Sequence, residues 1–215
     1  MIASFCPRAI LSDLDGVLVD SGDSIVRTWR RWAAGHGLPQ ARLDGLMHGR
    51  PSREVIALVA PDLDAAAEAE AIDRLEMAQG AARALPGAAE LLGGAAGRPV
   101  AVVTSCTRLL AVARLEALDL PVPEILVTAD DVHAGKPDPE GYLLAAERLE
   151  VAAAECLVLE DAPAGIAAAR AAGARVCAIT TSHAAAELGE ADALAASVAD
   201  ALRRYSPSSL RYSSR

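Results

Sequence analysis

Short apolar runs alternate with helical periodicity along most of this chain, and this alternation restricts its possible folds more than any other feature. Runs rich in Val, Ile or Leu, each about as long as a buried strand, lie at residues 8–16, 98–104, 124–128, 156–161 and 174–180. Helical spacing follows the later runs at residues 107–118, 139–149, 163–172 and 183–188. Alternating strands and helices are typical of a parallel sheet covered on both faces. The sequence therefore predicts an α/β fold.

One connection is too long for this pattern. About eighty residues separate the first predicted strand from the second, whereas a single crossover helix needs only about a dozen. The stretch has helical spacing at residues 24–36, 53–59 and 65–84, and prolines interrupt it. We interpret residues 20–85 as a helical domain inserted into a core formed by residues 1–19 and 86–205. The Ser- and Arg-rich segment 206–215 lacks periodicity and is predicted to be disordered.

Composition narrows the classes of partner. The net charge of −9 and the pI near 4.9 argue against nucleic acid and anionic membranes, which such a surface would repel. No apolar run reaches the ~18 residues of a membrane span, and Met1–Arg8 is too short for a signal peptide. The four cysteines lie apart, with no Cys-x-x-Cys pair. Reduced thiols and a cytoplasmic protein are the expectation.

Four of the predicted strands end in residues that carry chemistry. In chain order these residues are Asp13 and Asp15, Thr104 and Ser105, Lys136 in the loop after the third run, and Glu160 and Asp161. Lys136 is the one lysine among twenty basic residues. Ligands bind outside the carboxyl ends of parallel strands. We therefore expect a single site at this edge of the sheet.

The residue types in this set fit phosphoryl chemistry. The four carboxylates would repel one another unless a divalent cation lay among them, and oxygen ligands favour Mg²⁺ over Zn²⁺. Thr104 and the backbone amides after it can bind phosphate oxygens at the start of a helix. Lys136 supplies a point charge that neutralises a nucleophile and a transferring phosphoryl group. A small phosphorylated metabolite is the expected partner.

Four segments resemble the motifs of the haloacid dehalogenase superfamily, in the order and roughly the spacing of that family. They are Asp13-Leu-Asp-Gly-Val-Leu-Val-Asp-Ser21, Thr104-Ser105, Gly135-Lys-Pro-Asp-Pro-Glu-Gly-Tyr142 and Leu159-Glu-Asp-Ala-Pro-Ala-Gly-Ile166. The resemblance covers residues 8–200. It implies a modified Rossmann-like core with a helical cap inserted after the first motif.

The resemblance also implies a role for each motif residue. Asp13 would be the nucleophile that forms an aspartyl-phosphate. Asp15 would protonate the leaving alcohol and then deprotonate the attacking water. Asp13, the backbone carbonyl of Asp15 and Asp161 would hold Mg²⁺, with Glu160 beside them. Thr104, Ser105 and Lys136 would bind the phosphate.

The segment Met47–Asp62 is similar to the glycerol-3-phosphate and 2-deoxyglucose-6-phosphate phosphatases. A small sugar or polyol phosphate is therefore the expected substrate. That group usually has glycine where Cys106 stands, and its cap arginine lies one residue after Arg50. We expect Arg50 to reach the substrate, the alternative being a surface ion pair. Cys106 is either a buried inert thiol or an oxidation-sensitive site.

Two other functions stay open. Mutases of the phosphoglucomutase type carry a histidine five residues after the acid that matches Asp20, where this chain has Ile25. A catalytically silent protein that binds a phosphometabolite is the second alternative. Within the insertion, Trp29 and Trp32 lie three residues apart on one helical face, which favours packing over a substrate platform. The Gly-containing segments Asp20–Asp23 and Leu85–Gly87 are candidate hinges.

Overall fold

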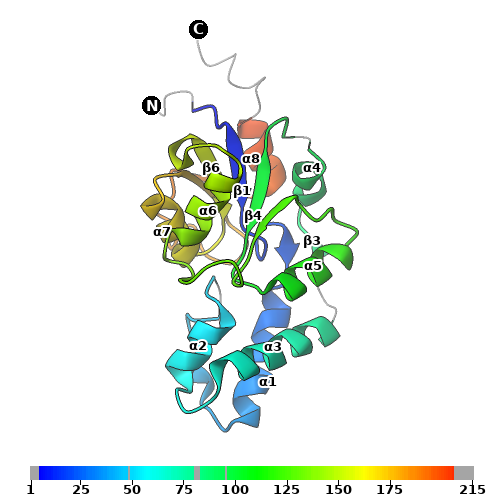
Figure 1. The fold of residues 1–215 in the computed structure, drawn as a ribbon, viewed down its shortest axis with the longest axis vertical. Coiled ribbons are helices and arrows are strands. Elements are labelled where there is room, and N and C mark those ends of the chain that lie inside the picture. The colour runs from blue at the N-terminus through cyan, green and yellow to red at the C-terminus, as the bar shows by residue number, and fades with distance from the viewer. Residues whose placement is uncertain (1–4, 48, 80–82, 95, 206–215) are drawn as a thin grey trace.

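The computed structural model describes residues 5–47, 49–79, 83–94 and 96–205. It consists of an α/β part and a smaller helical part below it, as Figure 1 shows. The helical part faces one end of the sheet, and the two parts meet where the strands end. The segment 206–215, predicted to be disordered, lies outside the described residues.

The sheet contains six strands in the order β5-β4-β1-β6-β7-β8, and every pair is parallel. Their bounds are β1 Ala9–Ser12, β4 Val100–Val103, β5 Ile125–Val127, β6 Cys156–Glu160, β7 Arg175–Ile179 and β8 Ala193–Ala195. Leu11 of β1 pairs with Ala101 on one side and Val158 on the other. All four residues of β1 are buried, because a central strand with both faces covered needs a continuous apolar run.

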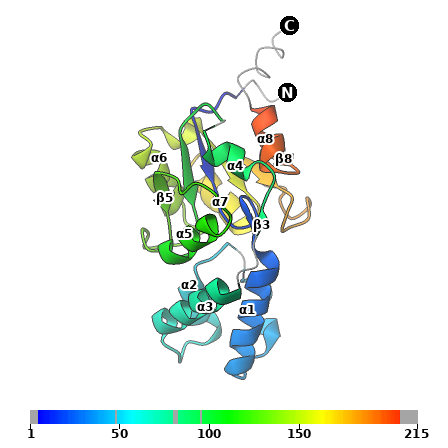
Figure 2. The same ribbon diagram turned by 90° about the vertical axis from the view of Figure 1, so that its right-hand side faces the viewer.

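Helices cover both faces of this sheet, which confirms the predicted α/β class (Figure 2). They are α4 Ala88–Leu92, α5 Arg108–Glu116, α6 Glu140–Arg148, α7 Pro163–Ala171 and α8 Val198–Arg204. One core cluster joins Leu115 of α5 and Val198 of α8 to the sheet. The other joins Tyr142 of α6 and Ile166 of α7 to the opposite face. Short 3₁₀ turns at Gln40–Arg42 and Ala153–Glu155 complete the helical elements of the described chain.

The helical part has its own hydrophobic core. It is built from α1 Gly22–Gly35, α2 Ser52–Val59 and α3 Ala65–Gln79, around a cluster that includes Trp29, Trp32, Ile56 and Ile72. The two indole rings meet edge to face, with 5.5 Å between their centroids. This confirms that the tryptophans pack within the insertion. The core cluster of the insertion is therefore separate from the two clusters that cover the faces of the sheet.

A two-stranded ribbon joins the two parts. Strands β2 Val19–Asp20 and β3 Arg83–Ala84 run antiparallel, so the entering and leaving segments of the insertion lie side by side. Arg83 Nε donates to Asp20 Oδ2 at 2.8 Å. The predicted hinge segments begin or end at this ribbon.

Two helix predictions were wrong, one at the end of its helix and the other over its whole length. Helical spacing predicted a helix as far as residue 84, but Arg83–Ala84 is a strand because it pairs with β2. Residues 183–188 form turns with bonds between residues i and i+3, such as Leu188 N–H to Ala185 O. A segment this short cannot offset the cost of nucleating an α-helix. Strand β8 and helices α4 and α8 were not predicted.

No helix among the described residues is long and apolar enough to cross a bilayer. This agrees with the sequence, in which no apolar run is long enough to do so.

Gly87 lies where the chain re-enters the core, and it allows α4 and α8 to approach closely. Its φ is +98°, and a Cβ at this position would lie 2.2 Å from the backbone nitrogen of Ala199. Gly94 has a similar φ of +85° but open space around it.

We expect Gly87→Ala to destabilise the protein by about 3 kcal/mol or more, because backbone strain and a steric clash add together. Gly94→Ala is the matched control and should cost about 1–2 kcal/mol through strain alone. Urea unfolding of the two variants measures the difference. Equal losses would contradict the close approach of α4 and α8.

Candidate active site

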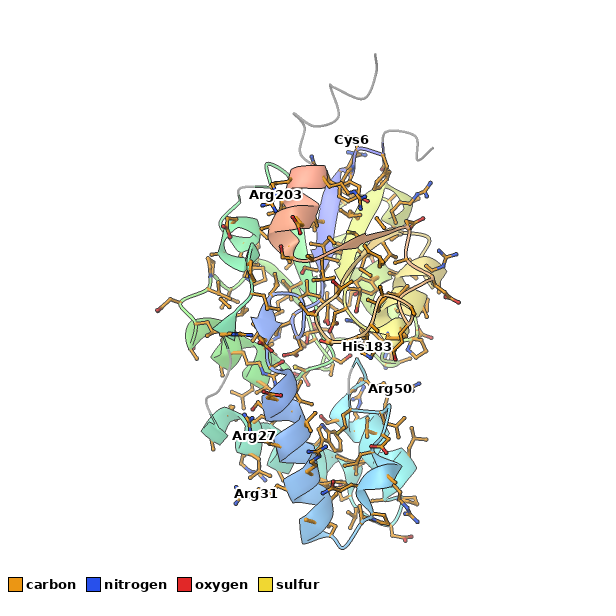
Figure 3. All side chains as sticks on the ribbon, turned by 180° about the vertical axis from the view of Figure 1, so that it is seen from behind. Cys6, Arg27, Arg31, Arg50, His183 and Arg203 are labelled. Carbon is orange, nitrogen blue, oxygen red and sulfur yellow. The ribbon has the colours of Figure 1, made fainter. Side chains whose placement is uncertain are left out.

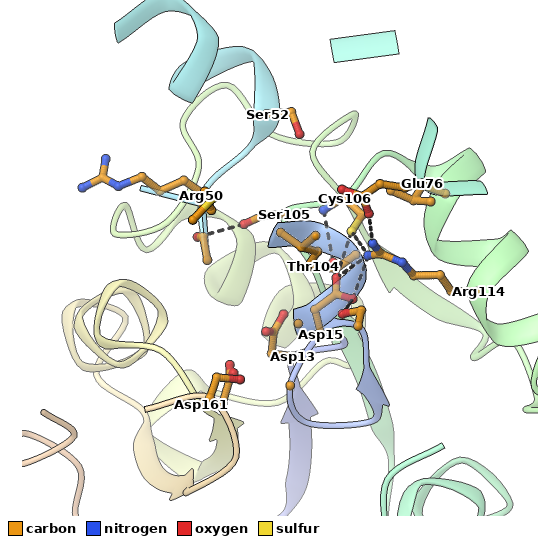
Figure 4. A pocket seen from close by; sticks show the side chains of 18 of the residues that line it. Asp13, Asp15, Arg50, Ser52, Glu76, Thr104, Ser105, Cys106, Arg114 and Asp161 are labelled. Carbon is orange, nitrogen blue, oxygen red and sulfur yellow. Dashed lines mark hydrogen bonds and ion pairs between the residues drawn. The ribbon is translucent and has the colours of Figure 1, made fainter. Parts of the chain in front are cut away.

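A pocket lies between the carboxyl ends of the strands and the helical part, and both parts line it (Figure 4). The core lining includes Asp13, Asp15, Gly16, Thr104, Ser105, Cys106, Leu110, Arg114, Asp161 and Ser182. The insertion contributes Ser21, Gly22, Ile25, Trp29, Met47, Gly49, Arg50, Ser52, Asp73 and Glu76. The predicted convergence of strand ends therefore occurs, and the helices of the insertion close the pocket from the other side.

A buried ion triad of Asp13, Lys136 and Glu160 adjoins this pocket, and of the three only Asp13 lines it. Lys136 Nζ donates to Asp13 Oδ1 at 2.8 Å, to Glu160 Oε1 at 2.7 Å and to the carbonyl of Val103 at 3.1 Å. Tyr142 donates its hydroxyl to the same Glu160 oxygen at 2.8 Å. Charges removed from water need partners with good geometry, and here one ammonium serves two carboxylates. One oxygen of Asp13 is bound by the ammonium, while Asp13 itself also lines the pocket.

The pKa values follow from this burial. Loss of hydration raises the pKa of Asp13 to about 7, against the opposing charge of Lys136. Burial alone would lower the pKa of Lys136, but the charges of Asp13 and Glu160 raise it well above its usual value. The pKa of Asp161 is also raised, by burial first and then by the charges of Glu160 and Asp13. The site therefore has an excess of negative charge that a cation would relieve.

Asp13, Glu160 and Asp161 form a buried group whose carboxylate oxygens lie within 4.8 Å of one another. Oxygen donors in this number suit a hard divalent cation. Glu160 is the most occupied of the three, since its second oxygen accepts the backbone N–H groups of Asp161 and Ala162. The residues present thus fit a metal ion, with Asp13 and Asp161 carrying the carboxylates that are less engaged.

Gly16 makes room for this carboxylate group. Its φ is +78°, and a Cβ there would lie 1.9 Å from Oδ2 of Asp161. A side chain at position 16 would take the space of that carboxylate. This is a steric reason for the glycine that follows the two aspartates.

Asp15 points to a different set of partners from Asp13. Its carboxylate accepts hydrogen bonds from Ser21 Oγ at 2.5 Å and from Arg114 Nη1, which lies 2.7 Å from both of its oxygens. Cys106 Sγ also donates to it at 2.9 Å. Burial raises the pKa of the Cys106 thiol well above its usual value, so the thiol stays protonated. This favours the inert thiol among the two interpretations of Cys106.

The segment after β4 lines the same pocket as these two aspartates. Thr104 is buried in the sheet edge, where its N–H donates to Val127 O and its Oγ1 accepts the N–H of Cys106. Ser105 lines the pocket, but its hydroxyl donates to the carbonyl of Gly49 in the insertion at 3.0 Å. The structure therefore brings Thr104 and Ser105 to the pocket and engages the Ser105 hydroxyl in a contact between the two parts.

Arg50 lies at the edge of the insertion that faces the core (Figure 3). It lines the pocket, yet its side chain extends away from Asp13 and Asp15 in the close view (Figure 4). No described residue forms a hydrogen bond or an ion pair with its side chain. The surface ion pair considered as the alternative role of Arg50 is therefore not found among the described residues.

Three charged residues that line the pocket were missed by the sequence analysis: Arg114, Glu76 and Asp73. Arg114 Nη2 donates to Glu76 Oε2, and Thr107 Oγ1 donates to Asp73 Oδ2 at 2.5 Å. Burial raises the pKa of Glu76 to about 7, while the charge of Arg114 opposes this shift. A signal for Arg114 was present, because it lies on the buried stripe of α5 together with Leu110, Ala111 and Leu115. A charged residue on an apolar helical face needs a buried partner.

The family model described as haloacid dehalogenase-like hydrolase matches residues 7–173. The chain belongs to this family. It is 40% identical over 192 residues to Hexitol phosphatase A of Escherichia coli, covering 86% of this chain and 88% of the relative. It is 39% identical to Validoxylamine A 7'-phosphate phosphatase of Streptomyces hygroscopicus, with 87% and 92% of the two chains covered.

Solved structures of the family have the same architecture. One is a putative beta-phosphoglucomutase from Thermotoga maritima, which matches with a TM-score of 0.67 and 28% identity. The match covers 91% of this chain and 97% of that one. The inserted helical part is thus the cap domain of a haloacid dehalogenase-like hydrolase, as the resemblance implied.

The raised pKa values predict that the metal-free protein loses stability as pH rises. Asp13 and Glu76 have pKa values of about 7 in the folded state, above their unfolded values of 3.8 and 4.5. The stability that these two groups contribute is fully present below their pKa values in the unfolded state. It is lost as the pH rises through their folded pKa values of about 7. We expect the free energy of unfolding in EDTA to fall between about pH 4 and 7 and to level off above that range.

Mg²⁺ should reduce this loss, because a cation favours the ionised form of Asp13. Urea unfolding with and without Mg²⁺ measures both effects, and Asp161→Asn is the control that should abolish the effect of Mg²⁺. A stability that rises across this pH range in EDTA would contradict the predicted shifts.

Proposed function

We propose that this protein is a Mg²⁺-dependent phosphatase that hydrolyses a small sugar or polyol phosphate through an aspartyl-phosphate intermediate. The observation that carries the proposal is the position of Asp13. Its carboxylate lies at the end of the central strand, lines the pocket and has one oxygen bound by Lys136. A buried carboxylate with one oxygen held by an ammonium has its other oxygen available for attack on phosphorus.

In the first chemical step, an oxygen of Asp13 forms a bond to phosphorus while the bond from phosphorus to the substrate oxygen breaks. Asp15 donates a proton to the leaving alcohol. In the second step Asp15 takes a proton from water, and the water oxygen attacks phosphorus. The bond between phosphorus and Asp13 then breaks, which releases inorganic phosphate and restores the carboxylate.

The other motif residues neutralise and orient the phosphoryl group. Lys136 lowers the negative charge on Asp13, and Thr104 with the amides that follow it binds phosphate oxygens. Asp13, the backbone carbonyl of Asp15 and Asp161 would hold Mg²⁺, with Glu160 beside them. The bound cation supplies charge that lets an anionic phosphate approach an anionic nucleophile.

Residues 20–85 act as a cap in this proposal. Helices α1–α3 close the pocket and exclude bulk water during phosphoryl transfer. The ribbon of β2 and β3 is the hinge, since both connecting segments pass through it. The unpaired cysteines among the described residues support a reducing, cytoplasmic setting.

Hexitol phosphatase A, at 40% identity, is named for a hexitol, which supports a sugar or polyol phosphate. A mutase is less well supported. The resemblance places a histidine of the mutases at the position of Ile25, and Ile25 lines the pocket with an aliphatic side chain that cannot exchange protons. A catalytically silent binding protein is also less well supported. Such a protein would need neither a nucleophile nor an acid–base group, whereas this chain has both Asp13, bound by Lys136, and Asp15, bound by Arg114.

Release of inorganic phosphate from a panel of phosphate esters tests the function. We expect hydrolysis of hexitol, hexose and glycerol phosphates that is lost in EDTA and restored by Mg²⁺. Asp13→Asn should lower turnover by at least about 10³-fold, because the nucleophile is lost, while its circular dichroism spectrum is retained. Substantial turnover by Asp13→Asn would contradict the assignment, and glucose 1-phosphate isomerised without phosphate release would indicate a mutase.

Arg50 is proposed as the cap residue that contacts the substrate. If its guanidinium turns into the pocket when substrate binds, Arg50→Ala should raise KM by about tenfold with a smaller change in kcat. Arg53→Ala is a matched control, because Arg53 also lies on the cap but its guanidinium donates to Val132 O. An unchanged KM in Arg50→Ala would remove Arg50 from the substrate site.

A further inference from the structure

Arg114 joins Asp15 to the cap helix α3. Its guanidinium lies in the core on α5, is 8% exposed, and joins two carboxylates that belong to different parts of the protein. Nη1 lies 2.7 Å from both oxygens of Asp15, and Nη2 donates to Glu76 on the cap helix α3. The donors of a guanidinium lie in one plane at fixed angles. The position of Glu76 therefore restricts the orientation of Arg114, and Arg114 restricts that of Asp15.

Docking of the cap does not by itself require this buried ion pair. Several other hydrogen bonds already join the cap to the core: Thr107 to Asp73 at 2.5 Å, Ser105 to Gly49 at 3.0 Å, Gly135 to Glu54 at 2.9 Å and Arg53 to Val132 at 3.1 Å. Removing a carboxylate and a guanidinium from water is costly even when they pair. What distinguishes the Arg114–Glu76 pair from the other contacts is its link to Asp15.

The remaining partners of Asp15 do not replace this link. Ser21 lies at the N-terminal end of α1, next to the hinge, and Cys106 lies on the loop after β4. A hydroxyl and a thiol each give one hydrogen bond, whereas Arg114 carries the charge that matches the carboxylate. Of these three partners, Arg114 alone also binds a cap helix that lies across the pocket from Asp15.

We propose that Arg114 is a positioning residue for Asp15, and that Glu76 makes this positioning depend on a docked cap. The proposal rests on the function of Asp15 proposed above. When the cap is docked, Glu76 holds the guanidinium and the guanidinium holds the carboxylate next to the pocket. When the cap moves away, Arg114 loses its second carboxylate and Asp15 its fixed orientation. Proton transfer is then efficient only while the pocket is closed to bulk water.

Two esters with different leaving groups test the proposal. Glycerol 3-phosphate releases an alkoxide that needs a proton, whereas p-nitrophenyl phosphate releases a stable phenolate that does not. We expect Glu76→Ala to slow single-turnover cleavage of glycerol 3-phosphate by about tenfold or more, and that of p-nitrophenyl phosphate by less than about threefold. Rapid quench and stopped-flow absorbance measure the two rates.

Asp73→Ala is the matched control. Asp73 lies three residues before Glu76 on α3. It also contacts α5, because it accepts a hydrogen bond from Thr107, the N-cap residue of α5, but it forms no hydrogen bond with Arg114. Loss of the contact between Asp73 and Thr107 should slow single-turnover cleavage of both esters by the same factor. Arg114→Lys should behave as Glu76→Ala does, and Glu76→Gln should recover part of the rate because its amide oxygen still accepts from Arg114.

Asp15→Asn separates a failure of this inference from a failure of the proposed function. If Asp15→Asn discriminates between the two esters but Glu76→Ala slows both equally, Glu76 has a structural role only and the inference is overturned alone. The inference is also overturned alone if Asp73→Ala slows cleavage of glycerol 3-phosphate more than that of p-nitrophenyl phosphate, as Glu76→Ala is expected to do. If Asp15→Asn shows no discrimination, the acid role of Asp15 fails and the inference fails with it. Circular dichroism of each variant excludes unfolding as the cause.

Discussion

The position of Lys136 between Asp13 and Glu160 is the interaction on which the rest of the site depends. Asp13 and Glu160 are buried at the carboxyl ends of the adjacent strands β1 and β6, Lys136 reaches both from the loop after β5, and each of the three charges would destabilise the fold without the others. The loop after β5 must therefore fold back over β1 and β6 to bring the ammonium to both carboxylates. The hydroxyl of Tyr142 and the carbonyl of Val103 satisfy what remains of the hydrogen-bonding capacity. The ion pairs of the site can therefore form only when β1, β6 and the loop after β5 lie in their observed positions.

Each aspartate of the first motif has its own cation from a different element. Lys136 binds Asp13 within the core, and Arg114 binds Asp15 while it also binds the cap. Leu14 lies between the two aspartates and is fully buried in the hydrophobic cluster. This arrangement separates the two carboxylates and gives them different surroundings. The nucleophile is held by the core alone, whereas the acid–base group contacts both parts of the protein.

The sequence predicted the elements whose signals are local. The apolar runs of the sheet, most helices and the inserted cap follow from periodicity and from the length of one connection. The failures occur where local signals are weak or are overridden. Arg83–Ala84 follows a helical pattern but forms a strand with partners 63 and 65 residues earlier in the chain, and residues 183–188 are too short for a helix. Arg114 was missed because its partners, Asp15 and Glu76, lie 99 and 38 residues away.

By itself the sequence determined the α/β class, the family and the set of strand-end residues, because spacing along the chain specifies periodicity and motif order. Only the tertiary structure decided which charges meet. It turned Arg50 away from the two aspartates, engaged the Ser105 hydroxyl with the cap and placed Arg114 between the core and the cap. Ion pairs and hydrogen bonds depend on distances of a few ångströms between groups that are remote in sequence. Those distances exist only once the two parts have folded and docked.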